Sequence, residues 1–253
     1  MSFNAKCETE RVIGFIRDYY SKNNLKGAIL GISGGKDSAV VAGLMVEALG
    51  KDNVLGVWMP CHSKEADKED AKLVSDYYGF ELIDYDLTNV YDTFKSNLES
   101  VGNFNSNQTL NSDINIKPRL RMATLYYFAA LYSEIKGGAY LVIGTSNKCE
   151  LHVGYFTKGG DSVHDIAPIA DFTVDEVIAI GEYIRVPEKN LYKTPDDGLS
   201  NKSDEDKLGV TYKDIAKRIN GEELPEEISK KIDAMHERNQ HKFNIPTYRK
   251  SND

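Results

Sequence analysis

The residues best suited to chemistry form one short run, Gly31–Ser38, of sequence GISGGKDS. The apolar residues before it are typical of a buried parallel strand, and the small apolar residues that follow, up to Gly50, are typical of a helix. Between a strand and a helix, neighbouring glycines let backbone N–H groups converge on an anion, to which the helix N-terminus adds partial positive charge. The run also contains two serine hydroxyls and the carboxylate of Asp37, an oxygen ligand of the kind that Mg²⁺ prefers. It therefore predicts a phosphate cradle that carries a metal ligand.

Two well-known phosphate-binding loops do not fit this run. A Walker A loop has four residues between its first glycine and its Gly-Lys pair, followed by Ser or Thr, but here Gly31 and Gly35 are closer and Asp37 follows Lys36. A dinucleotide-binding fingerprint needs the spacing GxGxxG, which these glycines do not provide. A tight turn without a ligand would explain a lone glycine pair, but the complete string SGGKDS favours nucleotide binding.

The string SGGKDS resembles the PP-loop of the ATP pyrophosphatase superfamily. Members of this superfamily cleave ATP between its α- and β-phosphates and leave an adenylated intermediate, which a nitrogen or sulfur nucleophile then attacks. Asparagine synthetases, GMP synthetases, tRNA-lysidine and thiolation enzymes, and NAD synthetases share this loop. The loop alone therefore implies a reaction class and leaves the substrate open.

Further segments narrow the resemblance. In chain order they are KPRLRM at 117–122, GTSNKCE at 144–150, GYFTKGGD to DIAP at 154–168, DEDKLGVTY at 204–212, and His241-Lys242. Each string is weak evidence by itself, but the set is collinear and spans most of the chain. By this resemblance the chain is identified as a member of the NAD synthetase family, of the ammonia-dependent type.

The resemblance implies a role for each matching residue. Asp37 and Glu150 are expected to hold Mg²⁺, although Glu150 on its own would be interpreted as a solvated surface carboxylate. Lys158 and Asp161 are the expected catalytic residues, with Asp161 receiving or orienting ammonia. The residues expected to bind ATP are Gly31, Ile32, Ser33, Gly34, Gly35, Lys36, Asp37, Ser38 and Thr145. Those expected to bind deamido-NAD are Arg119, Lys158, Asp165, His241 and Lys242.

Some positions depart from the family pattern or need separate treatment. Arg121 lies two residues from Arg119, so the two side chains point in different directions on a helix, and Arg121 is expected to be structural, in a dimer interface. Val174 stands where many family members carry a lysine near an ATP phosphate, and Asp196 stands where the lid usually has Ser or Thr. The ATP contacts that the family makes at these two positions are therefore not expected in this chain. Lys193 is a candidate to supply the lost positive charge.

The implied reaction is the amidation of deamido-NAD. Its nicotinate carboxylate would attack the α-phosphorus of ATP and release pyrophosphate, and ammonia would then attack the mixed anhydride to give NAD and AMP. Glutamine-using family members add a hydrolase domain, for which 253 residues leave no room. Free ammonia is therefore the expected donor, with a separate glutaminase partner as the alternative source.

The elements that must position these residues alternate along the chain. Strands are predicted at 28–33, 54–59, 81–85 and 140–144, and helices at 8–20, 37–49, 64–78 and 225–239. This alternation indicates one α/β domain over 1–253, with a doubly wound, mostly parallel sheet flanked by helices. A further helix that starts at Pro118 is apolar on most sides, which favours burial against a second subunit in a homodimer.

Two polar stretches are predicted to be mobile. Residues 102–116 are rich in Asn and Ser and are typical of a loop. Residues 194–208 are polar and acidic and are typical of a lid, whose closure would exclude water from the reactive anhydride.

Composition limits the alternatives. A net charge of −8 argues against a tRNA-modifying PP-loop enzyme, because phosphate neutralisation supplies most of the affinity of nucleic-acid-binding proteins. The pairing of Asp37 with Glu150 favours catalysis over a nucleotide-sensing protein of the same fold. The chain lacks a long apolar run, a signal-peptide pattern and any metal-binding or disulfide spacing among its three cysteines. We expect a cytoplasmic protein that binds neither nucleic acid nor membrane.

Overall fold

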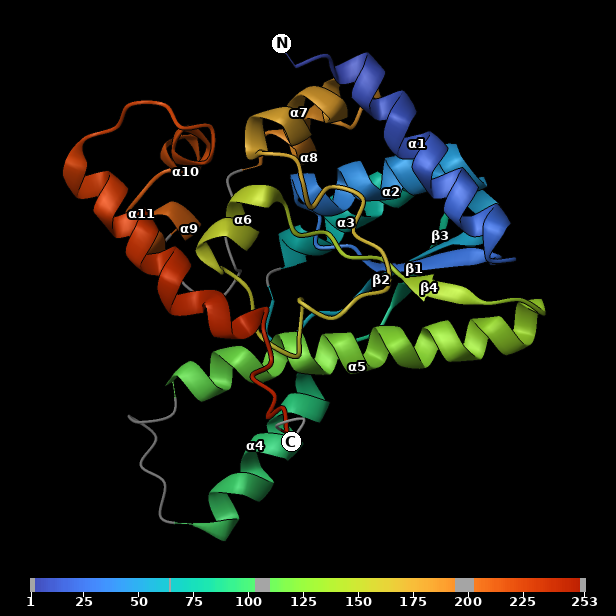
Figure 1. Cartoon of the computed structure of the whole chain (residues 1–253). Helices are drawn as coiled ribbons and strands as arrows, with labels where there is room; N and C mark the ends of the chain where they lie inside the picture. Colours follow the sequence, from blue (N-terminus) through green and yellow to red (C-terminus); the bar gives the residue numbers. More distant parts are fainter. Residues whose placement is uncertain (1–2, 64, 103–109, 194–202, 251–253) are drawn as a thin grey trace.

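The centre of the molecule is a four-stranded parallel sheet with helices on both faces (Figure 1). The computed structural model describes residues 3–63, 65–102, 110–193 and 203–250. The strands are β1 (Gly27–Gly31), β2 (Val54–Trp58), β3 (Glu81–Asp84) and β4 (Tyr140–Val142), in the spatial order β3-β2-β1-β4. Each neighbouring pair is parallel. The predicted α/β class and its four strands are confirmed.

One face of the sheet is covered by α1 (Ala5–Lys22), α2 (Lys36–Leu49), α3 (Glu65–Tyr78) and α7 (Val174–Tyr183). The small and branched apolar residues of α2 are buried over most of its length, against β1, β2, α1 and α7. The short helices η1 (Lys51–Asn53) and α8 (Glu188–Leu191) complete this layer, with α8 packed on α2 and α3. Because α2 is enclosed, the loop that precedes it is held in a fixed place at the end of β1.

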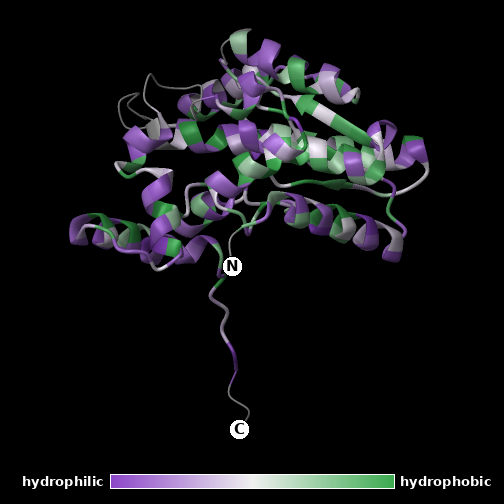
Figure 2. Cartoon of the chain, turned by 90° about the horizontal axis from the view of Figure 1, so that it is seen from above, coloured by the Kyte–Doolittle hydropathy of each residue, from purple (hydrophilic) through white to green (hydrophobic). Residues whose placement is uncertain are grey.

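The opposite face is covered by α5 (Leu110–Lys136), which runs below β1 and β4 in Figure 1 and packs against both. α4 (Thr88–Val101) contacts α5 and extends away from the sheet. In Figure 2 the strands are largely hydrophobic, while hydrophobic and hydrophilic residues alternate along the helices. A sheet covered on both faces explains why its strands are continuous apolar runs in the sequence.

The start of α5 differs from the sequence prediction. The helix begins at Leu110, so Pro118 lies inside it instead of opening it. The loop predicted for 102–116 is therefore wrong from residue 110 onward, and residues 103–109 lie outside the described part of the chain.

Tertiary contacts explain the helical turns before Pro118. A proline has no N–H group and removes one helical hydrogen bond, so local sequence alone favours a helix that starts there. The preceding turns are stabilised from outside: Lys95 of α4 lies 2.7 Å from Asp113, and the Thr157 hydroxyl donates a hydrogen bond to the Asn115 side chain. Such partners are distant in the sequence and leave no local pattern.

A separate apolar cluster joins α6 (Lys148–Val153), α9 (Asp204–Leu208), α10 (Tyr212–Ile219) and α11 (Glu226–Asn239), which leads into η3 (Gln240–Lys242). The predicted lid 194–208 ends in α9, whose first turn is closed by a reciprocal capping box. Residues 194–202 lie outside the described part of the chain. Within the described ranges, no helix combines the length and the apolar content needed to cross a membrane.

Candidate active site

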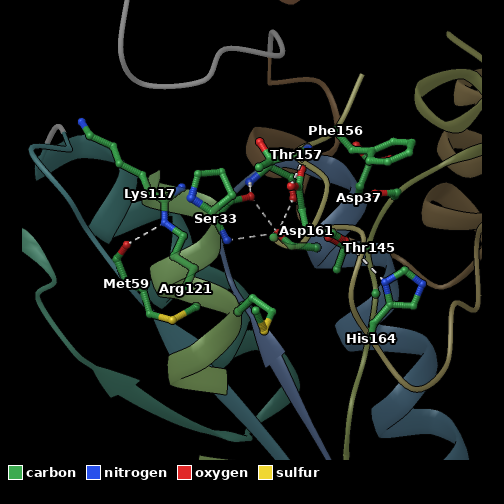
Figure 3. Close-up of a pocket in the computed structure, with 18 of the residues that line it drawn as sticks. Ser33, Asp37, Met59, Lys117, Arg121, Thr145, Phe156, Thr157, Asp161 and His164 are labelled. Atoms are coloured by element: carbon green, nitrogen blue, oxygen red, sulfur yellow. Dashed lines mark hydrogen bonds between the residues drawn. The ribbon is translucent and has the colours of Figure 1, made fainter. Parts of the chain in front are cut away.

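A cavity of about 660 Å³ lies at the carboxyl ends of the strands, where α/β sheets bind ligands. β2 and β4 flank β1 on opposite sides, so the cavity lies where the order of the strands reverses. Its walls include the phosphate loop (Gly31–Ser38), the first half of α5, the start of α6 and the segment that follows it. Figure 3 shows side chains from these separate elements pointing into one space.

The phosphate loop folds back on itself through its own hydroxyl groups. The Ser38 hydroxyl donates to the Gly35 carbonyl at 3.1 Å, and the Gly35 N–H donates to the Ser33 hydroxyl at 3.2 Å. Gly34 has a φ of +80°, and a Cβ there would lie 2.7 Å from the Cβ of Asp70, so only glycine fits. α2 begins after Gly35 without a side-chain cap, which leaves the N–H groups of its first turn available to an anion.

Three charged groups meet where α2 and α6 begin. The Lys36 ammonium, in a residue only 5% exposed, lies 3.1 Å from the Asp37 carboxylate. Burial alone would lower the pKa of Lys36, but Asp37 and Glu150 outweigh burial and raise it. Lys36 is therefore a fixed positive charge. Burial and the nearby Asp37 carboxylate in turn raise the pKa of Glu150 well above its usual value.

Asn147 connects the two carboxylates, and sequence reasoning missed it. Its Nδ2 donates to Asp37 at 3.2 Å, and its Oδ1 accepts from the backbone N–H groups of Cys149 and Glu150. The Glu150 carboxylate accepts the Asn147 N–H at 3.1 Å and completes a capping box for α6. An Asn three residues before a Glu, in the segment between a predicted strand and a helix, was the available signal.

The chemistry of Asp37 and Glu150 fits a divalent cation. Both line the cavity, both offer oxygen ligands, and the pKa of Glu150 is raised by burial and by the like charge of Asp37, which a cation would compensate. Over the described ranges, no group of three or more His, Cys, Asp or Glu side chains is arranged to hold a metal ion. A cation on this pair would therefore take its other ligands from phosphate oxygens and water, as Mg²⁺ does in nucleotide sites.

The two arginines of α5 take places that differ from those expected. Arg121 lines the cavity, and its Nε donates to the Met59 carbonyl at 3.0 Å (Figure 3). Arg119 is exposed, and its guanidinium donates to the Lys158 carbonyl at 3.2 and 3.3 Å. Among the described residues, Arg119 does not line the cavity. The cavity therefore presents the arginine that the sequence analysis treated as structural.

Lys117 is a second cavity residue to which the sequence analysis gave no role. It is buried, donates to the Cys61 carbonyl at 3.2 Å and lies 5.0 Å from the centre of the Tyr91 ring. Lys117 and Arg121 are four residues apart, so both lie on the same helix face. That spacing was the signal in the sequence.

Asp161 and Lys242 come from distant segments and both line the cavity. Asp161 accepts the Thr157 N–H at 2.8 Å, and burial raises the pKa of its carboxyl group. Lys242 donates to the carbonyls of Gly154 and Phe156 at 2.7 and 2.8 Å, and burial lowers its pKa. The structure thus brings these two expected site residues together.

Lys158, His241 and Asp165 lie beside the cavity, outside its described wall. The Lys158 ammonium donates to the His241 carbonyl at 2.7 Å. The Asp165 carboxylate accepts the Tyr126 hydroxyl at 3.0 Å and the Val142 N–H at 2.8 Å. In this chain Asp165 therefore joins α5 to β4.

The remaining positions singled out in the sequence differ in whether they line the cavity. Thr145 lines the cavity just after β4. Val174 is 9% exposed and belongs to the apolar cluster around α6, so its place in the core agrees with the absence of a phosphate contact. Lys193 lines the cavity and pairs with two carboxylates of α3. Asp196 lies outside the described residues.

Comparison with known proteins gives one consistent family. The family model described as NAD synthase matches residues 8–246. The NH(3)-dependent NAD(+) synthetase of Carboxydothermus hydrogenoformans is 38% identical over 247 residues, which cover 97% of this chain and 98% of that protein. The NMN synthetase from Francisella tularensis has a TM-score of 0.88 at 30% identity, covering 98% of this chain and 99% of its own. The NH3-dependent NAD synthetase from Campylobacter jejuni has a TM-score of 0.79 at 29% identity, covering 98% and 100%.

The family match extends over every segment that lines the cavity, from the phosphate loop to Lys242. Fold, cavity and sequence therefore agree, and the chain belongs to the NAD synthase family.

Proposed function

We propose that this chain makes NAD by ATP-dependent amidation of deamido-NAD (nicotinic acid adenine dinucleotide) with ammonia. The observation that carries the proposal is a single cavity that combines the phosphate loop, the Asp37–Glu150 pair and the acid Asp161. The loop and the carboxylate pair suit the phosphates of ATP. The acid suits proton transfer at a reacting nitrogen.

The first step transfers AMP to the nicotinate carboxylate. ATP phosphates bind the N–H groups of the phosphate loop and the start of α2. A carboxylate oxygen forms a bond to the α-phosphorus, and the bond from that phosphorus to the α–β bridging oxygen breaks. The electron pair leaves with pyrophosphate, whose growing charge is stabilised by Lys36 and the loop N–H groups. These groups are already in place, so the transition state needs little reorganisation.

We assign Asp37 and Glu150 as the ligands of Mg²⁺. When bound, the ion would supply Lewis-acid stabilisation of phosphate oxygens. Asn147 keeps both carboxylates in position, since its side chain bonds to one and its backbone N–H to the other. Asn147 is fully buried, which fixes its own orientation.

The second step forms the amide. Ammonia attacks the carbonyl carbon of the mixed anhydride, the C–O bond to AMP breaks, and the nitrogen loses a proton. We assign Asp161 as the group that orients ammonia and accepts this proton, because its raised pKa makes its carboxylate a stronger base than an exposed aspartate. The Thr157 N–H holds this carboxylate in the cavity wall.

We assign deamido-NAD to the side of the cavity formed by α5 and the C-terminal segment. Arg119, Lys158 and His241 form a series just outside the described wall on this side, because each of the first two donates to the backbone carbonyl of the next. Lys242 then reaches into the cavity. These groups concentrate positive charge for the pyrophosphate of a dinucleotide in a chain whose net charge is −8.

We also propose a homodimer that forms through α4 and α5. α4 exposes an apolar stripe at helical spacing, made of Val90, Phe94, Leu98 and Val101. α5 adds the exposed apolar residues Tyr127 and Ile135. Exposed apolar surface of this extent on neighbouring helices is typical of a protein–protein interface.

A direct assay tests the proposed activity. The purified chain with deamido-NAD, Mg-ATP and ammonium should yield NAD and AMP in equal amounts. Glutamine as the only nitrogen source should not support the reaction, and an added glutaminase should restore it. Formation of neither NAD nor AMP with ammonium would contradict the proposal, as would efficient use of glutamine by the chain alone.

A second candidate is the amidation of nicotinic acid mononucleotide, favoured by the TM-score of 0.88 with an NMN synthetase. Both substrates carry the same nicotinate carboxylate, so the two steps above apply to either. Comparing kcat/KM for the dinucleotide and the mononucleotide separates them. A higher value for the mononucleotide would replace the first proposal by the second.

A further inference from the structure

Lys193 is a cavity residue that the proposed reaction has not yet used. It follows α8, and its ammonium nitrogen lies 2.7 Å from a carboxylate oxygen of Asp67 and 2.7 Å from one of Asp70. Both acids belong to α3. Lys193 is therefore held at the cavity wall by two fixed partners on one helix.

The same part of α3 lies directly behind the phosphate loop. A Cβ on Gly34 would meet the Cβ of Asp70 at 2.7 Å and the Asp67 carbonyl oxygen at 3.1 Å. The fully buried Asn190 donates one hydrogen bond to the Gly34 carbonyl at 2.8 Å and another to the Asp70 carbonyl at 2.9 Å. The loop, α3 and α8 thus form one connected unit, and Lys193 is anchored to it beside Gly34.

Lys193 retains both its charge and a donor. Burial alone would lower the pKa of Lys193, but the hydrogen bonds and charges of Asp67 and Asp70 outweigh burial and raise it. An ammonium group has three N–H donors, of which the two carboxylates take two. Among the residues that the structure describes, no hydrogen-bond partner takes the third, which can therefore donate to a ligand in the cavity.

Charge neutralisation of Asp70 does not by itself explain Lys193. Lys189 lies 2.6 Å from the other carboxylate oxygen of Asp70, so that acid already has a cationic partner. The Lys189 side chain is 58% exposed and lies outside the cavity wall, whereas the Lys193 side chain is 28% exposed and faces the cavity. Both lysines thus pair with Asp70, but Lys193 also pairs with Asp67 and lines the cavity.

We propose that Lys193 binds the β- and γ-phosphates of ATP and remains on the pyrophosphate as it leaves, and that Asp67 and Asp70 hold it in place for this purpose. The inference rests on the proposed function, in which the bond between the α-phosphorus and the bridging oxygen breaks. Lys36 in the loop and Lys193 beside it, both in the cavity wall, would then contact the phosphates. Lys193 would thus supply the positive charge near the phosphates that the apolar side chain of Val174, buried in the core, does not supply.

The test compares Lys193→Met with the matched control Lys189→Met, since each variant removes one ion pair to Asp70. Binding of Mg-pyrophosphate and of Mg-ATP is measured by calorimetry, and KM is measured for both substrates. Lys193→Met should weaken pyrophosphate binding by about tenfold to hundredfold, the range for one charge-assisted hydrogen bond. The KM for ATP should rise while the KM for deamido-NAD stays within about twofold, and Lys189→Met should resemble the wild type.

Pyrophosphate binding to Lys193→Met within twofold of the wild type would overturn the inference. An equal loss in both variants would also overturn it, because it would indicate a structural role for the ion pairs. Lys193→Gln, which keeps a donor without the charge, serves as a second variant if the Met variant does not fold. A wild type that binds pyrophosphate but makes no NAD would contradict the proposed function and leave the role of Lys193 intact.

Discussion

At the scale of single residues, the carboxylate of Glu150, a proposed Mg²⁺ ligand, should lower the stability of the metal-free protein. Its pKa is raised by burial and by the facing Asp37, so ionising it in the folded, metal-free protein costs free energy. The unfolded chain releases the same proton at the ordinary pKa of a glutamate, about 4.3. The stability of the metal-free protein should therefore fall as the pH rises from there through the raised pKa. A bound cation would offset the free-energy cost of ionising Glu150 in the folded protein.

Glu150→Gln should remove that cost. At neutral to mildly alkaline pH and without metal, the melting temperature should rise by about 2–4 °C, the shift that about 1 kcal/mol produces in a chain of this size. The gain should shrink as the pH is lowered toward 4.3, and Mg²⁺ with ATP should no longer stabilise the variant as it does the wild type. The exposed Glu134→Gln is the control and should leave both properties unchanged. A variant that is less stable at every pH would refute the account of Glu150.

Asn147 combines two roles that can be separated by substitution. Asn147→Ala should lose about 1 kcal/mol of stability through the missing helix cap, together with Mg²⁺-dependent activity. Asn147→Ser should regain the cap but not the bond to Asp37, so stability should return while activity stays low. Asn4, which caps α1 through its side chain, gives the control: Asn4→Ala should cost similar stability and no activity. Full activity in Asn147→Ser would show that the bond to Asp37 has no part in the reaction.

At the scale of elements, the phosphate loop and its two flanking elements could be predicted because their signals are local. The apolar run of β1, the glycines and the start of α2 are consecutive in the sequence. The early start of α5 could not be predicted in this way, because its first turns depend on Lys95 and Thr157, which lie in other segments. For the same reason, the sequence could not predict which of Arg119 and Arg121 lines the cavity. Their spacing shows only that they lie on different faces of the helix, and contacts with distant segments decide which face lines the cavity.

Gly34 is the position where the loop and α3 meet most closely. Gly34→Ala should lower the free energy of unfolding by about 2–5 kcal/mol, because of the positive φ and of overpacking against Asp70. It should also abolish ATP binding. Gly221 has a φ of +74°, and a Cβ there would meet no atom within 4 Å, so Gly221→Ala should lose only about 1–2 kcal/mol and keep ATP binding. Urea denaturation measures the loss of stability, and calorimetry measures the binding of ATP. Similar losses in the two variants would contradict the role of the close contact.

At the scale of the whole molecule, the acidic chain places several positive groups in the wall of one cavity and exposes an apolar stripe on α4. The cavity joins residues from Gly31 to Lys242, so it depends on the complete fold. The stripe lies on α4, which packs against α5, and α5 carries Lys117 and Arg121 in the cavity wall. Assembly and substrate binding should therefore be linked.

Leu98→Glu should place a charge in the centre of this stripe and convert the dimer to a monomer, as measured by light scattering after gel filtration. The KM for deamido-NAD should rise more than the KM for ATP, because α5 borders the dinucleotide side of the cavity. Tyr77→Glu, at an exposed aromatic on α3, is the control and should leave the assembly intact. A wild-type chain that elutes as a monomer would contradict the proposed dimer.

The central claim is that the nicotinate carboxylate attacks the α-phosphorus of ATP and that ammonia then displaces AMP from the anhydride. Deamido-NAD labelled with ¹⁸O in that carboxylate tests it most directly, with mass spectrometry of AMP and pyrophosphate after one turnover. The account predicts one ¹⁸O atom in the phosphate of AMP and none in pyrophosphate, because the C–O bond to AMP breaks in the amidation step. AMP without label, or label in pyrophosphate, would contradict an adenylated carboxylate in this site.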